Sequence, residues 1–103
     1  MADAKSSTLD ELRRIILPSH LIKQMGWVAG TRVADLLVEK KQSIMLIEQE
    51  NGELWIDDLG RVTLNPEYCD ALGWSAKDVI NIITADGNST SLLLTTLPVG
   101  FPG

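Results

Sequence analysis

Residues 10–47 of this chain return in altered form 47 positions later. The pair Gly26-Trp27 recurs as Gly73-Trp74, and eight of the 38 positions from Asp10 to Ile47 are identical to their counterparts without a gap. The identical pairs are Asp10/Asp57, Leu12/Leu59, Arg14/Arg61, Leu17/Leu64, Gly26/Gly73, Trp27/Trp74, Ala29/Ala76 and Leu46/Leu93. A repeat of this length predicts one supersecondary unit used twice. Since two units are too few for a solenoid, we expect them to close on each other as one pseudo-symmetric domain over residues 1–103.

The bulk composition agrees with a single globular domain. The chain has 103 residues, of which 45% are apolar and 22% are charged. No apolar run approaches the ~20 residues of a membrane helix, and residues 1–10 lack the basic-then-apolar plan of a signal peptide. The single cysteine, Cys69, excludes an internal disulfide. We therefore expect a cytoplasmic protein with no membrane partner.

Each repeat begins with an acidic turn that leads into a short strand. The turns are Asp10-Glu11-Leu12 and Asp57-Asp58-Leu59-Gly60. Aspartate favours turns because its carboxylate bonds to its own backbone, and Gly60 can adopt a positive φ. The β-rich runs Arg14–Leu17 and Arg61–Leu64 follow.

Proline then ends each strand and begins a short helix. In the second repeat, Asn65 is a good N-cap and Pro66 occupies the first helical position, where its missing N–H costs nothing. In the first repeat Ser19 is the expected cap. Gly26 and Gly73 stand where a left-handed residue ends a helix, so each helix should have about two turns.

A pair of strands closes each repeat. The expected strands are Arg32–Glu39 and Ser43–Gln49, joined at Lys40-Lys41-Gln42, and Asp78–Ala85 and Thr90–Thr96, joined at Asp86-Gly87-Asn88. Asn51-Gly52 is a further hairpin signal, predicted to fold Ser43–Gln49 back against Glu53–Ile56. Repeat one thus covers about 6–50 and repeat two about 53–97, before an apolar tail, 98–103.

These residues resemble a known family. The run Asp57-Asp58-Leu59-Gly60-Arg61-Val62-Thr63-Leu64-Asn65-Pro66-Glu67, followed by Leu72-Gly73 and Asp78, is similar to the AbrB/MazE/SpoVT motif. That motif is a D-x-L-G-R strand, a proline-started helix and an L-G turn before a hairpin. The run Asp10–Pro18, followed by Met25-Gly26 and Gly30, looks like a second copy.

The resemblance implies a mostly β fold with two short helices, a pseudo-two-fold swapped-hairpin β-barrel. In that family two copies, usually from two chains, interleave their hairpins into one barrel. Here both copies lie in one chain, as in the MraZ-type arrangement, so the barrel can close without a partner.

The resemblance also implies a transcriptional regulator that binds double-stranded DNA. The basic residues expected to contact phosphates are Arg13, Arg14, Lys23, Lys40, Lys41 and Arg61. Two alternatives remain open. Arg14 and Arg61 can instead pair with the aspartates four residues before them, and Lys40-Lys41 can be a solvated hairpin tip.

The charge distribution is also compatible with a second function. Residues 13–47 carry six basic and two acidic residues, net +4, whereas residues 48–59 carry only acidic charges, net −5. The whole chain is at −5, and the strands before the acidic turns are uncharged. The alternative is therefore an interaction module of the same fold that does not bind DNA, either an antitoxin-like partner binder or an assembly subunit.

The aromatic residues divide between core and surface. Trp27 and Trp74 follow the helix-ending glycines and are expected in the core, since tryptophan buries a large area. Trp55 has Thr8 as its counterpart and is the better candidate for an exposed contact with a protein partner or a second copy. Phe101 in the tail is the other such candidate.

Enzymatic and metal chemistry find no support in the sequence. His20 and Cys69 are the only histidine and cysteine, too few for a zinc site. No phosphate loop, H-E-x-x-H or G-x-S-x-G motif occurs. We expect no enzyme activity, no metal and no cofactor.

Overall fold

Short antiparallel strands make up most of the regular secondary structure of this protein. The computed structural model describes residues 5–84 and 91–96, without the Lys5 side chain. Its strands and helices are β1 (Lys5–Thr8), β2 (Arg14–Ile16), α1 (Ser19–Met25), β3 (Arg32–Val38), η1 (Glu39–Lys41), β4 (Ser43–Glu48), β5 (Leu54–Trp55), β6 (Arg61–Thr63), α2 (Pro66–Leu72), β7 (Val79–Thr84) and β8 (Ser91–Thr95). The fold is therefore mostly β with two short helices, as expected.

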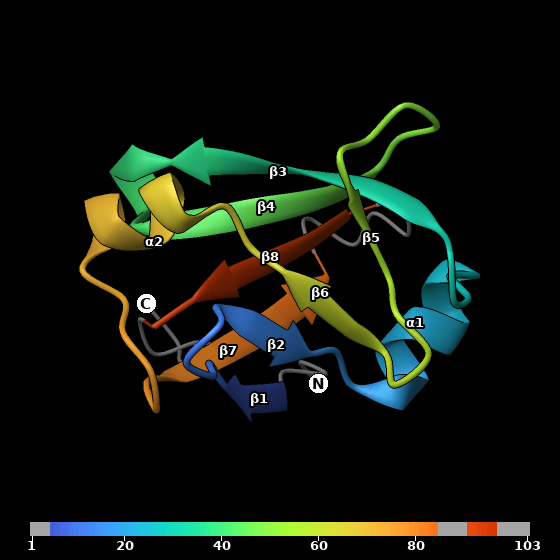
Figure 1. Cartoon of the computed structure of the whole chain (residues 1–103), viewed down its shortest axis with the longest axis horizontal. Coiled ribbons are helices and arrows are strands. Elements are labelled where there is room, and N and C mark those ends of the chain that lie inside the picture. Colours follow the sequence, from blue (N-terminus) through green and yellow to red (C-terminus); the bar gives the residue numbers. More distant parts are fainter. Residues whose placement is uncertain (1–4, 85–90, 97–103) are drawn as a thin grey trace.

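The strands form a curled antiparallel half-barrel and a separate two-stranded ribbon. The half-barrel has the order β1-β7-β8-β4-β3-β5, and the ribbon pairs β2 with β6. Figure 1 shows the ribbon lying across the sheet, with α1 and α2 at opposite ends of the molecule. Ile15 and Val62 are paired at the centre of the ribbon, and both are buried in the core.

One hydrophobic core serves both halves of the chain. Its members are Leu9, Ile15, Leu17, Leu21, Met25, Trp27, Val33, Ile44, Leu46, Ile56, Val62, Leu64, Cys69, Trp74, Ile80, Ile82, Leu92 and Leu94. The expectation that Trp27 and Trp74 are core residues is confirmed, since both are buried.

The edge strands of the sheet are exchanged between the halves. β1, from the first half, pairs with β7 of the second, and β5, from the second half, pairs with β3 of the first. Just beyond each strand of the ribbon, a backbone hydrogen bond also joins the two halves. Leu17 donates to the Gly60 carbonyl, and Leu64 donates to the Arg13 carbonyl, each at 2.9 Å.

The helix boundaries follow the expected signals with one correction. Asn65 caps α2, its side chain accepting a bond from the Glu67 N–H, and Gly26 and Gly73 end the two helices in the left-handed conformation. The prediction that Ser19 caps α1 is wrong. Pro18 is the N-cap, without a side-chain bond, and Ser19 is the first helical residue.

Pro18 and Asn65 stand at equivalent positions and are accommodated differently. The Asn65 N–H donates to the Asp35 carboxylate at 2.9 Å. Pro18 has no N–H to satisfy, and the residue in the place of Asp35 is Ile82, which is fully buried. An acceptor from one half is therefore present only where the other half supplies a donor.

The gapless repeat holds up to β7 but not for the last strand. Val33 pairs with Glu48 in the first hairpin, so a constant offset would pair Ile80 with Thr95. Instead Asn81 pairs with Thr95. The second hairpin is one residue longer, and the offset of β8 is 48. The buried Leu46 thus corresponds to the buried Leu94, not to the half-buried Leu93.

The hairpin predicted at Asn51-Gly52 is also wrong. β5 lies beside β3 through the pairs Arg32–Trp55 and Val33–Leu54, whereas β4 lies between β3 and β8. Gly52 is buried, and a Cβ there would collide with the carbonyl group of Val33. Glycine is needed at this position for close backbone approach rather than for a tight turn. The predicted strand ends at Asp86-Gly87-Asn88 fall outside the described residues.

We expect Gly52→Ala to lower the free energy of unfolding by about 3 kcal/mol, because a rigid strand must move to admit the methyl group. Gly26→Ala is the control, since it has open space around it but a φ of 76°, and should cost about 1 kcal/mol. Urea unfolding of both variants measures the difference. Equal losses would contradict the close approach of Gly52 to β3.

Candidate nucleic-acid interface

The outer face of the β2–β6 ribbon carries two arginines together with one polar and one apolar side chain. Because neighbours on a strand point to opposite faces, burial of Ile15 and Val62 turns the flanking residues outward. The register places Arg14 opposite Thr63 and Ile16 opposite Arg61. Two arginines from the two halves therefore share one outward face.

Each arginine is held by the acidic turn that precedes it. Asp10 accepts bonds from the Leu12 and Arg14 N–H groups at 2.8 Å and from the Arg14 Nε at 2.7 Å. Asp57 does the same for Leu59 and Arg61, with the Nε bond again at 2.7 Å. The ion-pair alternative for both arginines is thus observed.

The same contacts set the ionisation of the two aspartates. Burial acts to raise the pKa of Asp10, but the Arg14 N–H, the Arg14 side chain and the Leu12 N–H outweigh it and hold the pKa below 3.8. The pKa of Asp57 is lowered in the same way, burial being overcome by Arg61 and Leu59. The carboxyl groups of Asp10 and Asp57 are therefore ionised at neutral pH.

The ion pairs leave part of each guanidinium available. Within the described part of the chain, each of these two guanidinium groups makes a hydrogen bond through its Nε atom alone. The Nη atoms of Arg14 and Arg61 have no partner among the described residues. The aspartates orient the two side chains, and the Nη groups are left to bind an external acceptor such as a phosphate or a base edge.

Arg13 belongs to the same region but is committed to a different contact. It adopts a φ of 63°, matching the 76° of Gly60, its counterpart in the motif. Its guanidinium pairs with Asp70 on α2 at 3.2 Å. A cation on the first turn thus meets an anion on the second helix.

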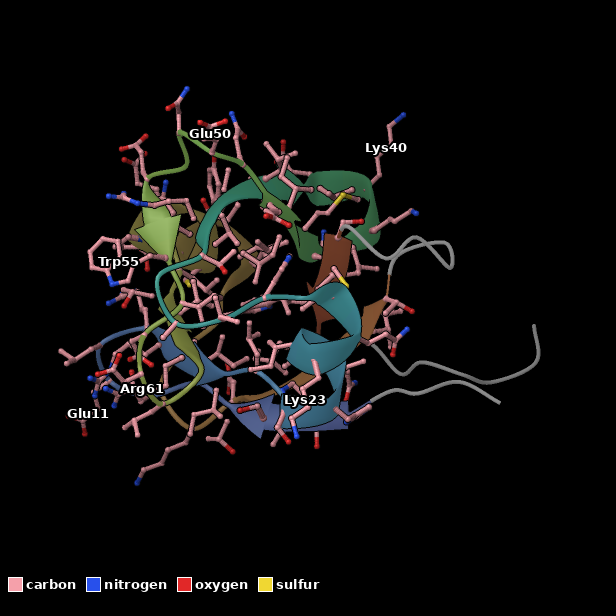
Figure 2. The ribbon with its side chains drawn as sticks, turned by 90° about the vertical axis from the view of Figure 1, so that its right-hand side faces the viewer. Glu11, Lys23, Lys40, Glu50, Trp55 and Arg61 are labelled. Atoms are coloured by element: carbon pink, nitrogen blue, oxygen red, sulfur yellow. The ribbon has the colours of Figure 1, made fainter. Side chains whose placement is uncertain are left out.

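The structure does not gather all six predicted cations on one face. Lys23 lies exposed on α1, and Lys40 and Lys41 lie exposed in η1, at the tip of the first hairpin. Figure 2 shows Lys40 on the opposite side of the molecule from Trp55 and Arg61. In the described part of the chain, no carboxylate pairs with any of these lysines.

Trp55 lies on the ribbon side of the molecule, as Figure 2 shows. It is 55% exposed, as expected for a contact residue. Arg32 stacks on its ring at 5.7 Å and donates through Nη1 to the Gly52 carbonyl at 3.2 Å. Phe101, the other predicted contact, falls outside the described residues.

A pocket of about 210 Å³ joins Trp55 to the two ribbon arginines. Its lining residues are Arg14, Leu54, Trp55, Asp57, Arg61 and Thr63. Sequence analysis missed Leu54 and Thr63, and it missed Arg32 behind the tryptophan. Nothing in their local sequence marks them, because the site depends on the pairing of β3 with β5 and of β2 with β6, which joins distant segments.

The Cys69 thiol and the Asp35 carboxyl both have raised pKa values, and their positions in the fold account for the shifts. Burial, with smaller contributions from Asp35 and Asp70, raises the pKa of Cys69 to about 11 against the opposing charge of Arg13, so the thiol is a core residue. Burial and the charge of Glu53 raise the pKa of Asp35, although its bond from the Asn65 N–H opposes the shift. The described residues hold no cluster of His, Cys, Asp or Glu suited to a metal.

In comparisons with known protein families and with curated proteins, no family and no curated protein matches this chain. Among the described residues, no helix has both the length and the apolar character needed to span a membrane.

We expect acid to destabilise the protein through the two turns. A carboxyl whose pKa falls on folding contributes stability that is present above pH 3.8 and lost as the pH drops through the lowered value. When the pH is lowered from neutral to below about 4, the free energy of unfolding should therefore fall less in the double variant Asp10→Asn/Asp57→Asn than in the unmodified protein. Urea unfolding from neutral to acidic pH tests this, with Asp58→Asn as the control in the same turn. Identical pH profiles for the double variant and the unmodified protein would contradict the role of the turns.

Cys69 should resist thiol reagents in the folded protein. With a pKa of about 11, about one thiol in a thousand is ionised at pH 8, and the side chain is buried. A chromogenic disulfide should react with it completely in urea and much more slowly in buffer. Equal rates under the two conditions would show that Cys69 is accessible.

Proposed function

We propose that this chain is a DNA-binding regulator of the AbrB-like type, built as a tandem swapped-hairpin barrel. The exchange of β1 and β5 between the halves supports that architecture. The equivalent bounds of β2 and β6, and of α1 and α2, at an offset of 47 also support it. The resemblance of both acidic turns and strands to the family motif connects the fold to DNA.

The observation that carries the proposal is the pair of oriented arginines on the ribbon. The major groove of B-DNA admits a two-stranded β-ribbon. Arg14 and Arg61 occupy equivalent positions on such a ribbon and present free Nη groups outward. Arginine suits phosphates and guanine edges alike, so the two side chains supply the main contacts.

The proposed face is narrower than the set of cations predicted from sequence. It consists of Arg14 and Arg61, with Arg13 next to Arg14 in sequence. It leaves out Lys40, which lies on the other side of the molecule, and Lys41, which follows Lys40 in η1. Glu11 and Asp58 at the tips of the turns are exposed and repel a duplex. Binding is therefore weak, and its salt dependence is modest because each of the few phosphate contacts adds only about 0.9 to the slope of log affinity against log salt.

Neutralising both ribbon arginines, as Arg14→Gln/Arg61→Gln, should weaken duplex binding and reduce the slope of log affinity against log salt by about 0.9 per arginine. Fluorescence anisotropy with a labelled duplex at several low salt concentrations measures both quantities. Lys40→Gln/Lys41→Gln removes the same charge from the opposite side and should have a smaller effect. Equal losses would show that the ribbon is not the contact face.

A gain-of-binding variant tests the same face from the other direction. Asp70 occupies the place that Lys23 has in the first half, and it neutralises Arg13. Asp70→Lys therefore adds a helix cation and frees the guanidinium, which should strengthen binding. Unchanged affinity would exclude α2 from the interface.

A second function is favoured by apolar residues exposed on and around the ribbon. Leu12, Leu59, Ile16 and Trp55 are all more than half exposed. Trp and Arg are enriched at the centres of protein interfaces, and exposed apolar residues beside them fit a protein partner. If the unmodified protein binds no duplex even at low salt, the interaction module becomes the better proposal.

A further inference from the structure

The surface around Trp55 is hollowed on more than one side. Besides the pocket shared with the ribbon arginines, one hollow runs from Trp55 to Gly30 and Leu59, and another runs to Asp35 and Pro66. Trp55 lines all three. An exposed aromatic ring at the meeting point of several hollows is accessible to a ligand rather than covered by the fold.

The indole of Trp55 is held in place from one side. Arg32 stacks on it at 5.7 Å and is itself anchored by the Gly52 carbonyl. Gly52 is fixed against β3, where it has no room for a side chain. The ring is therefore preorganised for stacking, which lowers the entropic cost of binding a flat group.

The ribbon supplies guanidinium donors to the pocket, each paired with an aspartate of the preceding turn. Arg14 and Arg61 line it, and their Nη groups are free within the described part of the chain. The Asp57 carboxylate accepts two backbone N–H bonds and the Arg61 Nε bond, so its charge is largely compensated. The Nη groups therefore offer charge-assisted hydrogen bonds to an anion, at a site where Asp10 and Asp57 balance the charge of the two arginines.

The other half of the chain does not repeat this arrangement. Thr8 stands in the place of Trp55, Val79 in that of Arg32 and Ile16 in that of Thr63. None of the three substitutes offers an aromatic ring or a charge. The pocket is thus a specialisation of one side and not a by-product of the repeated unit.

We propose that this pocket binds a single unstacked nucleotide, with its base on Trp55 and its phosphate between Arg14 and Arg61. Its volume of about 210 Å³ is below the ~300–1,000 Å³ of sites that bury a drug-sized ligand, so the pocket would hold no more than part of a single nucleotide. The nucleotide is either free or an unpaired residue of a DNA strand. Only the second source rests on the proposed DNA binding.

Isothermal titration calorimetry with deoxyadenosine monophosphate, deoxyadenosine and inorganic phosphate tests the pocket itself. The monophosphate should bind more tightly than either part alone. Trp55→Leu should weaken its binding roughly tenfold, the loss of one stacked base, whereas Trp55→Phe should retain most of it. Arg14→Gln/Arg61→Gln should abolish the advantage over the nucleoside, and Lys40→Gln/Lys41→Gln should not. Equal binding of phosphate and monophosphate, or no effect of Trp55→Leu, overturns the proposal.

A comparison of blunt duplex with duplex bearing a short single-stranded overhang separates the two sources. A preference for the overhang that disappears in Trp55→Leu supports the strand as ligand. Monophosphate binding without any DNA binding supports the pocket for free nucleotide and overturns the proposed function. Duplex binding with no overhang preference and no monophosphate binding overturns the pocket and leaves the proposed function intact.

Discussion

The pairing of β2 with β6 holds the two halves of this protein together at their centre. Ile15 and Val62 meet there and are buried, so the ribbon cannot shift by one residue without exposing both. The same register fixes which side chains face outward. The presentation of Arg14 and Arg61 is therefore a consequence of core packing, and the candidate site depends on a contact that lies beneath it.

Around this ribbon, β2 and β6 and the two helices have matching bounds at an offset of 47, but the residues at matching positions differ in chemistry. Asn65 of the second half donates its N–H to Asp35 of the first, whereas at the equivalent positions Pro18 has no N–H and Ile82 has no acceptor. Arg13 and Asp70 likewise stand in the places of Gly60 and Lys23. In both cases the two residues that interact come from different halves of the chain.

The consequence for function is an asymmetric surface. Trp55, with Arg32 stacked on it, lies beside the ribbon on one side only. The acidic turns orient the ribbon arginines and also lower the local positive potential. A ligand of this face must therefore be recognised through a few well-placed contacts, because the surface has no extensive positive potential to attract it.

Local features were readable in the sequence because they depend on residues close together along the chain. The Gly-Trp repeat, the acidic turns, the Asn65 cap and the helix-ending glycines are of this kind, and so is the burial of Trp27 and Trp74. The exposure of Trp55 followed from the absence of an aromatic counterpart. The repeat also located the equivalent arginines, although not their surroundings.

Tertiary structure decided the features that depend on residues distant in sequence. Gly52 read as a turn residue, but its close approach to Val33 arises from the pairing of β5 with β3. The longer second hairpin was invisible because Leu93 and Leu94 are the same residue type, and only the pairing register distinguishes them. Trp55, Arg14 and Arg61 likewise meet only because β2 pairs with β6 and β5 with β3, which joins segments that no local pattern connects. The position of Lys40 on the other side of the molecule is also visible only in the tertiary structure.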